Sequence, residues 1–121
     1  MEGNLRKFVQ KVRFFQKSLY PKRYFVIDFT IAKMFIKKDR ALEAGPNDTP
    51  TSDVKVLPFR SILDCSKPCV TSIPSDVPKK WRHLFMLRTI DRVFTLFAQS
   101  ENEVDIWMAG FIYVITSTRT V

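Results

Sequence analysis

The sequence predicts a mainly β domain in which several antiparallel strands precede one C-terminal α-helix. Two observations support this fold class. From residue 24 to residue 98, short segments rich in aromatic and β-branched residues alternate with turn-forming residues. Beyond residue 100, the apolar residues recur at the helical period instead. With 121 residues, of which 45% are hydrophobic and 26% charged, we expect residues 1–121 to form a single domain.

The predicted strands are identified by their composition and by the turns between them. Six segments qualify: residues 24–27, 30–36, 54–59, a stretch within 60–72, 83–89 and 92–98. Tight turns fit at Asp28-Phe29 and at Ile90-Asp91, which predicts two hairpins. Pro58 indicates an edge strand or a bulge, because proline donates no ladder hydrogen bond. The polar stretch 39–53 is expected to be a long loop, since its residues favour turns over packed structure.

The C-terminal segment has the pattern of one amphipathic helix. Ser100 stands at an N-cap position with Glu103 three residues later, which is the spacing of a capping box. Apolar residues then recur three and four positions apart, at Val104, Trp107, Met108, Phe111, Val114 and Ile115. These features predict a helix from about residue 101 to residue 116. Trp107 is expected to plug the core.

The first 19 residues fit two local structures. Over residues 5–17, apolar residues at helical spacing alternate with basic ones, which is typical of a helix lying on a membrane surface. The same stretch also fits a strand from Leu5 to Val9 followed by a basic turn. Local pattern does not decide between these two structures.

The order of these elements resembles the pleckstrin-homology (PH) domain. The segments that carry the resemblance are Gly3–Lys7, Tyr20–Ile27, Val56–Phe59, Leu84-Phe85 with Arg92–Ala98, and Ser100–Trp107. The resemblance covers nearly the whole chain. It implies a PH-like seven-stranded antiparallel bent sandwich, or barrel, capped by the C-terminal helix. It also favours a strand over residues 3–9 and a basic loop over residues 10–19.

The net charge of +8 lies entirely in the first third of the chain. Residues 1–40 hold 11 basic and three acidic side chains, whereas the numbers balance in residues 41–121. Such an asymmetry indicates an anionic partner. Strand alternation places Lys7 in the inward row of Leu5, and Arg23 in that of Phe25. In an antiparallel pair both cations reach the same end of the sheet, where buried charges need an anion or solvent.

We therefore expect a cationic mouth that binds a phosphate-bearing headgroup. The predicted headgroup-binding residues are Lys7, Lys11, Arg13, Lys17, Lys22 and Arg23. Phe14 and Phe15 are predicted to insert into the membrane, whereas Leu19 and Tyr20 are expected to pack on the sandwich. The resemblance assigns phosphate contacts to Lys7 and Arg23. Pro21 and Met34 depart from the family pattern, so we expect modest discrimination between headgroups.

The predicted function is anionic phospholipid binding, with phosphoinositides or phosphatidic acid as ligands. We expect a monomeric cytoplasmic protein that is peripheral on membranes, because no apolar run approaches the ~18 residues of a membrane span and no signal peptide is visible. The alternative is a module that binds an acidic protein. Nucleic acid is the weakest partner, since charge alone supports it. Cys65, Cys69 and His83 do not follow a zinc spacing, and we expect no metal, cofactor or enzymatic activity.

Overall fold

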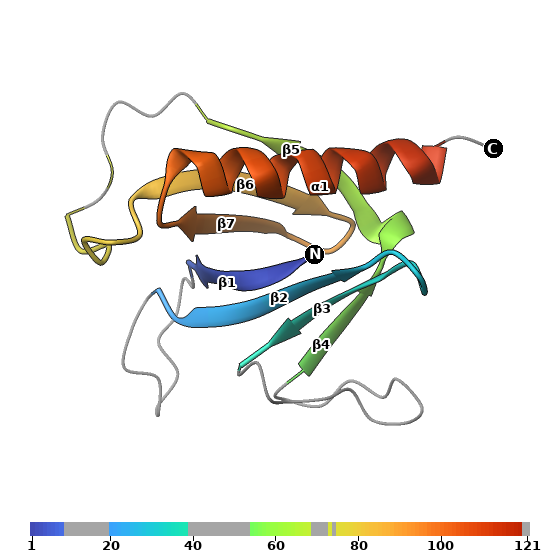
Figure 1. Cartoon of the computed structure of the whole chain (residues 1–121), viewed down its shortest axis with the longest axis horizontal. Helices are drawn as coiled ribbons and strands as arrows, with labels where there is room; N and C mark the ends of the chain where they lie inside the picture. Colours follow the sequence, from blue (N-terminus) through green and yellow to red (C-terminus); the bar gives the residue numbers. More distant parts are fainter. Residues whose placement is uncertain (9–19, 39–53, 69–72, 74, 120–121) are drawn as a thin grey trace.

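The protein is described by a computed structural model that covers residues 1–8, 20–38, 54–68, 73 and 75–119. Within these ranges, seven strands precede one α-helix, α1 (Glu101–Arg119), as Figure 1 shows. A short 3₁₀ turn, η1 (Phe59–Ser61), joins β4 to β5. The strands are β1 (Glu2–Lys7), β2 (Lys22–Asp28), β3 (Lys33–Lys37), β4 (Val54–Pro58), β5 (Ile62–Ser66), β6 (His83–Thr89) and β7 (Val93–Ala98).

The strands form one antiparallel sheet in the order β4-β3-β2-β1-β7-β6-β5. β1 pairs with β2 through five residue pairs and β6 with β7 through six, but β1 meets β7 through only two, Arg6 with Phe97 and Lys7 with Leu96. In Figure 1 the two halves of the sheet, β1–β4 and β5–β7, spread from this narrow junction, and α1 lies across the β5–β7 half. The predicted PH-like fold of seven antiparallel strands and one helix is confirmed.

The turn between β2 and β3 is longer than the sequence predicts. The Oδ1 atom of Asp28 accepts hydrogen bonds from the N–H groups of Thr30 and Ile31, at 3.0 and 3.4 Å. Ala32 follows with φ of 57°, outside the strand region. The prediction of a strand starting at Thr30 is therefore wrong, because the Asp28 side chain holds the next residues in a turn.

The N-terminal segment forms a strand where the sequence allowed a strand or a helix. Glu2–Lys7 pairs with β2, and Leu5 is fully buried between the layers. A helix starting at Leu5 is thereby excluded. Residues 9–19, which complete the alternative helix, and the predicted loop at 39–53 lie outside the described residues.

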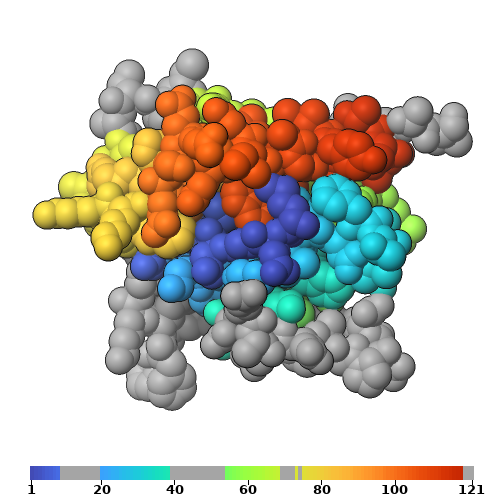
Figure 2. Space-filling view, viewed as in Figure 1, coloured from blue at the N-terminus to red at the C-terminus, as the bar shows by residue number. Residues whose placement is uncertain are grey.

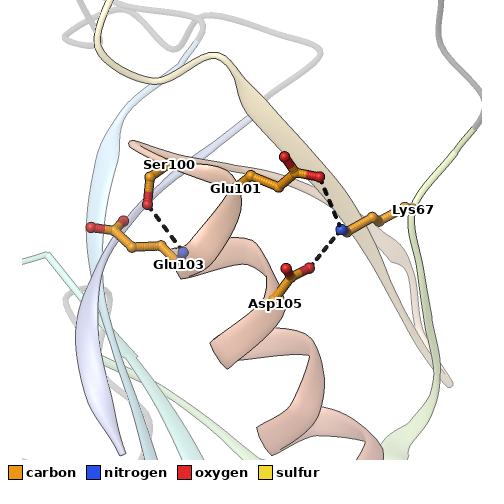
Figure 3. A network of polar contacts seen from close by, with 5 residues as sticks. All are labelled: Lys67, Ser100, Glu101, Glu103 and Asp105. Carbon is orange, nitrogen blue, oxygen red and sulfur yellow. Dashed lines mark hydrogen bonds and ion pairs between the residues drawn. The ribbon is translucent and has the colours of Figure 1, made fainter.

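The helix begins at the predicted capping box. Ser100 Oγ accepts a hydrogen bond from the N–H of Glu103 at 3.1 Å, and the Glu103 carboxylate accepts one from the N–H of Gln99 at 3.2 Å. Lys67, just beyond β5, donates a hydrogen bond to Asp105 at 2.6 Å and lies 3.9 Å from Glu101 (Figure 3). The Ser100 contact satisfies one N–H group of the first helical turn, and the Lys67 contacts tie that end of α1 to the end of β5. The helix ends at Arg119, three residues beyond the prediction.

Trp107 attaches α1 to the core. Its ring stacks on Phe111 at 5.9 Å between centroids and meets the ring of Phe25 at 6.2 Å and 74°. Gly3 of β1 lies against this ring, since a Cβ there would be 3.2 Å from it. Figure 2 shows α1, in orange and red, lying directly against β1, in blue. The predicted role of Trp107 as a core plug is confirmed, for the side chain is 5% exposed.

Replacing Trp107 by alanine should lower the free energy of unfolding by about 3–5 kcal/mol, because it leaves a large cavity under the helix. Urea unfolding followed by circular dichroism measures the change. The neighbouring variant Ile106→Ala is the control, since Ile106 is 53% exposed, and its change should stay within about 0.5 kcal/mol. Equal stability of Trp107→Ala and wild type would contradict docking of α1 through this ring.

Removing the N-cap oxygen should also be measurable. We expect Ser100→Ala to lower the free energy of unfolding by about 1 kcal/mol, because the N–H of Glu103 loses its acceptor. Ser100→Asp supplies another acceptor and should retain most of the stability. Urea midpoints of the three proteins test this, and an alanine variant as stable as the aspartate variant would argue against the cap.

Candidate anion-binding site

Lys7 and Arg23 lie where strand alternation predicts. Leu5 pairs directly with Arg23, and Lys7 continues the inward row of Leu5 at the end of β1. The N–H of Lys7 donates to the carbonyl of Pro21 at 3.1 Å, so the end of β1 and the start of β2 adjoin. Arg23 is half-buried, and burial lowers the pKa of its guanidinium, which donates to the Lys22 carbonyl at 2.9 Å. The two cations therefore occupy one end of the sheet.

Two further cations reach this end from parts of the chain that the sequence analysis passed over. Lys55 of β4 pairs with the inward residue Ile36, and Arg92 immediately precedes β7. The Nζ atoms of Lys7 and Lys55 lie 5.7 and 5.5 Å from the centroid of the Phe94 ring, and Arg92 Cζ lies 5.6 Å from it. All three distances fall within cation–π range. We call Lys7, Lys55 and Arg92 the Phe94 cation cluster.

The cluster concentrates positive charge at the edge of the core. Phe94 is 3% exposed and belongs to the apolar core, so the three cations lie where the core meets the surface. Burial, and next the charge of Arg92, lower the pKa of Lys55, while Asp91 acts in the opposite direction. An anion placed among these groups would favour the charged form of Lys55. Ammonium and guanidinium groups are the donors that bind phosphate in proteins, and this cluster supplies both kinds.

Lys22 faces the other side of β2 from Arg23. It is exposed and lines a groove with Glu2, Trp81 and Trp107. The structure thus brings Lys7 together with Lys55 and Arg92, but does not bring Lys22 to them. The other predicted site residues, Lys11, Arg13, Phe14, Phe15 and Lys17, lie outside the described residues and remain predictions.

The outer face of the sheet holds a structural cation and the tyrosine that was expected to pack there. The guanidinium of Arg6 lies 5.3 Å from the Trp81 ring and donates to the carbonyl of Tyr20 at 2.8 Å. Tyr20 is 4% exposed, sits edge-on to Phe97 at 5.5 Å, and donates its hydroxyl hydrogen to Asp76. The predicted packing of Tyr20 is confirmed, whereas Leu19 lies outside the described residues.

Cys65 and the other potential metal ligands among the described residues show what chemistry this part of the chain offers. There, no three His, Cys, Asp or Glu side chains gather as a metal site would require. Cys65 is free and buried, and burial together with Asp64 raises the pKa of its thiol to about 12. That thiol is therefore protonated and a poor nucleophile at neutral pH. The described helix does not have the length and apolarity needed to cross a bilayer.

The PH domain family model matches residues 1–116, and the chain therefore belongs to the PH domain family. Domains of this family are generally non-catalytic modules that bind lipids or proteins. No curated protein sequence matches the chain.

Solved structures show the same fold at low sequence identity. A chain in the crystal structure of SifA and SKIP has a TM-score of 0.65 and 18% identity, over 96% of this chain and 97% of that one. The activated truncation of Vav1 has a TM-score of 0.63 and 20% identity, over 99% of this chain but 27% of the Vav1 chain. The N-terminal PH domain of human ARAP2 has a TM-score of 0.59 and 14% identity, over 100% of this chain and 83% of the ARAP2 chain.

If the Phe94 cation cluster accepts a phosphate group, pyrophosphate should stabilise the folded protein more than chloride does at equal ionic strength. At ten times its dissociation constant, a ligand contributes about 1.4 kcal/mol, which raises the melting temperature of a domain of this size by about 5–6 °C. Thermal unfolding of wild type, Lys55→Gln and Arg92→Gln measures this shift.

The control is Lys22→Gln, which removes an exposed cation from the other face of β2. It should keep the full pyrophosphate shift, while Lys55→Gln and Arg92→Gln lose most of it. Equal shifts in all four proteins would show that pyrophosphate acts through general charge and not through the cluster.

Proposed function

We propose that this protein is an anionic phospholipid-binding, membrane-targeting module that holds a phosphoinositide or phosphatidic acid headgroup at its cationic mouth. The observation that carries the proposal is the convergence of Lys7, Lys55 and Arg92 on the Phe94 ring, with distances of 5.5–5.7 Å to its centroid. These residues come from three distant parts of the sequence. A surface that is basic only by composition does not require such convergence.

The aromatic ring supports this role for a physical reason. A ring face attracts a cation through its quadrupole but carries no net charge, so it does not neutralise the cation as a carboxylate would. Its contact with the ring therefore leaves the charge of Lys55 able to attract a phosphate oxygen. Asp91 is the acidic neighbour acting on Lys55, and a bound phosphate would compete with it. Arg92 offers a paired fork of donors, and the two lysines offer point charges.

The proposed site includes Arg23 and the segment that joins β1 to β2. That segment starts after Lys7 and returns at Lys22, and it contains Lys11, Arg13 and Lys17, which we propose as further headgroup contacts. Phe14 and Phe15 in the same segment are proposed to insert below the headgroups. Each basic residue close to an anionic surface adds about 1 kcal/mol to binding. The protein would thus reside in the cytoplasm and associate peripherally with membranes.

Selectivity between headgroups should be modest. Met34 is fully buried and pairs with Ile27 and Leu57, so it offers no hydrogen-bond donor to a headgroup. Pro21 is buried and brings no charge to the start of β2. The recognition proposed here therefore rests on phosphate charge more than on the stereochemistry of an inositol ring. The alternative function, binding of an acidic segment of a partner protein, would use the same cations.

Sedimentation with vesicles tests the proposal. Wild type should bind vesicles containing a phosphatidylinositol phosphate or phosphatidic acid but not neutral vesicles. Binding should weaken with added salt, because exposed charges are screened over ~8–10 Å near physiological ionic strength. Lys7→Ala and Lys55→Gln should each weaken binding about fivefold or more, as expected for loss of ~1 kcal/mol. Arg23→Ala should weaken binding more than Lys17→Ala, because a half-buried forked contact exceeds an exposed point charge.

Lys22→Gln is the matched control and should lose less than Lys55→Gln, since its side chain faces away from the cluster. If folded wild type binds neither lipid, or if Arg23→Ala binds as well as wild type, the proposed lipid-binding site is wrong. Binding to an acidic protein partner would then be the leading function.

A further inference from the structure

Exposed apolar side chains lie beside the Phe94 cation cluster, on the turn between β6 and β7. Ile90 is 65% exposed and Val93 is 51% exposed. Arg92, a member of the cluster, lies between them in sequence. Phe8, which directly follows β1, is 38% exposed. An apolar surface of this kind in contact with water is unfavourable, and one rimmed by charge often marks an interaction site.

Strand alternation puts the side chains of Val93 and Phe8 on the outer face of the sheet. Phe94 points into the core, so Val93 points outward from β7. The N–H of Phe8 donates to the carbonyl of Thr95 at 3.0 Å, which continues the pairing of β1 with β7 toward the β6–β7 turn. Phe8 and Val93 therefore lie on the outer face of the paired strands β1 and β7. The β6–β7 turn lies at the end of this pair.

The turn is held in place by hydrogen bonds. The N–H and the hydroxyl of the buried Thr89 donate to the carbonyl of Arg92 at 2.8 and 3.0 Å. The N–H of Ile90 donates to the carbonyl of Ser61 at 2.9 Å, which fixes the turn to η1. The side chain of Ile90 is thus presented to solvent by an ordered backbone. Little conformational entropy remains to be lost when that side chain enters another environment.

We propose that the β6–β7 turn, with Ile90 at its tip and Val93 beside it, inserts into the interfacial layer of an anionic bilayer. This inference rests on the proposed function. A bilayer fits because it offers anionic charge at the headgroup level, where Lys55 and Arg92 lie, and apolar surface directly below it for Ile90 and Val93. Arg88, opposite Val93 in the register, adds another cation to the same surface.

Asp91 opposes this contact. Asp91 lies between Ile90 and Arg92 in the sequence, is exposed, and its negative charge acts on Lys55. An anionic bilayer repels this carboxylate, and insertion requires its partial desolvation. Asp91→Asn should therefore bind anionic vesicles about two- to fivefold more tightly than wild type.

The test compares Ile90→Ser with Ile106→Ser, an exposed isoleucine on α1. α1 packs on Met1 and Gly3, at the opposite end of β1 from Lys7. On vesicles containing phosphatidic acid, Ile90→Ser should bind about fivefold to tenfold more weakly, because serine lacks the apolar surface that Ile90 would bury in the bilayer. It should keep the pyrophosphate shift in melting temperature, which reports the cluster without a bilayer. Ile106→Ser should match wild type in both assays.

A second measurement locates the turn directly. The indole introduced by Ile90→Trp should be quenched by lipids brominated in the acyl chain, whereas the indole introduced by Ile106→Trp should not. Trp81 and Trp107 are buried in the wild-type structure and should give the same background in both variants. This measurement also decides the matter if Ile90→Ser fails to fold.

The outcomes separate the two proposals. If wild type binds vesicles but Ile90→Ser binds equally well and Ile90→Trp is not quenched, insertion of the turn is overturned and the lipid-binding function stands. If wild type binds no vesicle of any tested composition, the lipid-binding function falls and the insertion falls with it.

Discussion

The alternation of side chains along each strand is the constraint from which both the core and the candidate site follow. Every second residue of a strand points inward, so an apolar row on one strand continues until the strand leaves the core. Leu5 and Phe25 are fully buried members of two such rows. The next inward positions toward the mouth are Lys7 and Arg23. A charge in such a row is tolerated only where the row meets solvent or an anion.

The two ends of β1 solve this problem in opposite ways. At one end Gly3 lets the Trp107 ring approach the backbone, and α1 closes the barrel with apolar side chains. At the other end the rows finish in cations, and the Phe94 ring separates them from the interior. A helix that covered both ends would leave no opening for a ligand. The asymmetry therefore makes one end structural and leaves the other for binding.

Much of this arrangement was predictable from the sequence, because the signals are local. The capping box at Ser100 and the spacing around Trp107 depend on residues within a few turns of helix. The strand from Gly3 to Lys7 was not decidable locally, since its apolar residues fit both periods; pairing with β2 and burial of Leu5 select the strand. The start of β3 was missed because the Asp28 side chain, and not residue propensity, sets the length of the turn.

The sequence by itself determined the fold class, the helix cap, and the inward positions of Lys7 and Arg23, since these follow from short-range periodicity. Only the tertiary structure decided which cations meet. Lys55 and Arg92 also occupy inward positions of the strand pattern. Their part of the chain, residues 41–121, carries no net charge, so the distribution of charge along the sequence did not single them out. They join Lys7 because the bent sheet brings the start of β4 and the β6–β7 turn to the end of β1. Such a meeting depends on strand order, which no local pattern encodes.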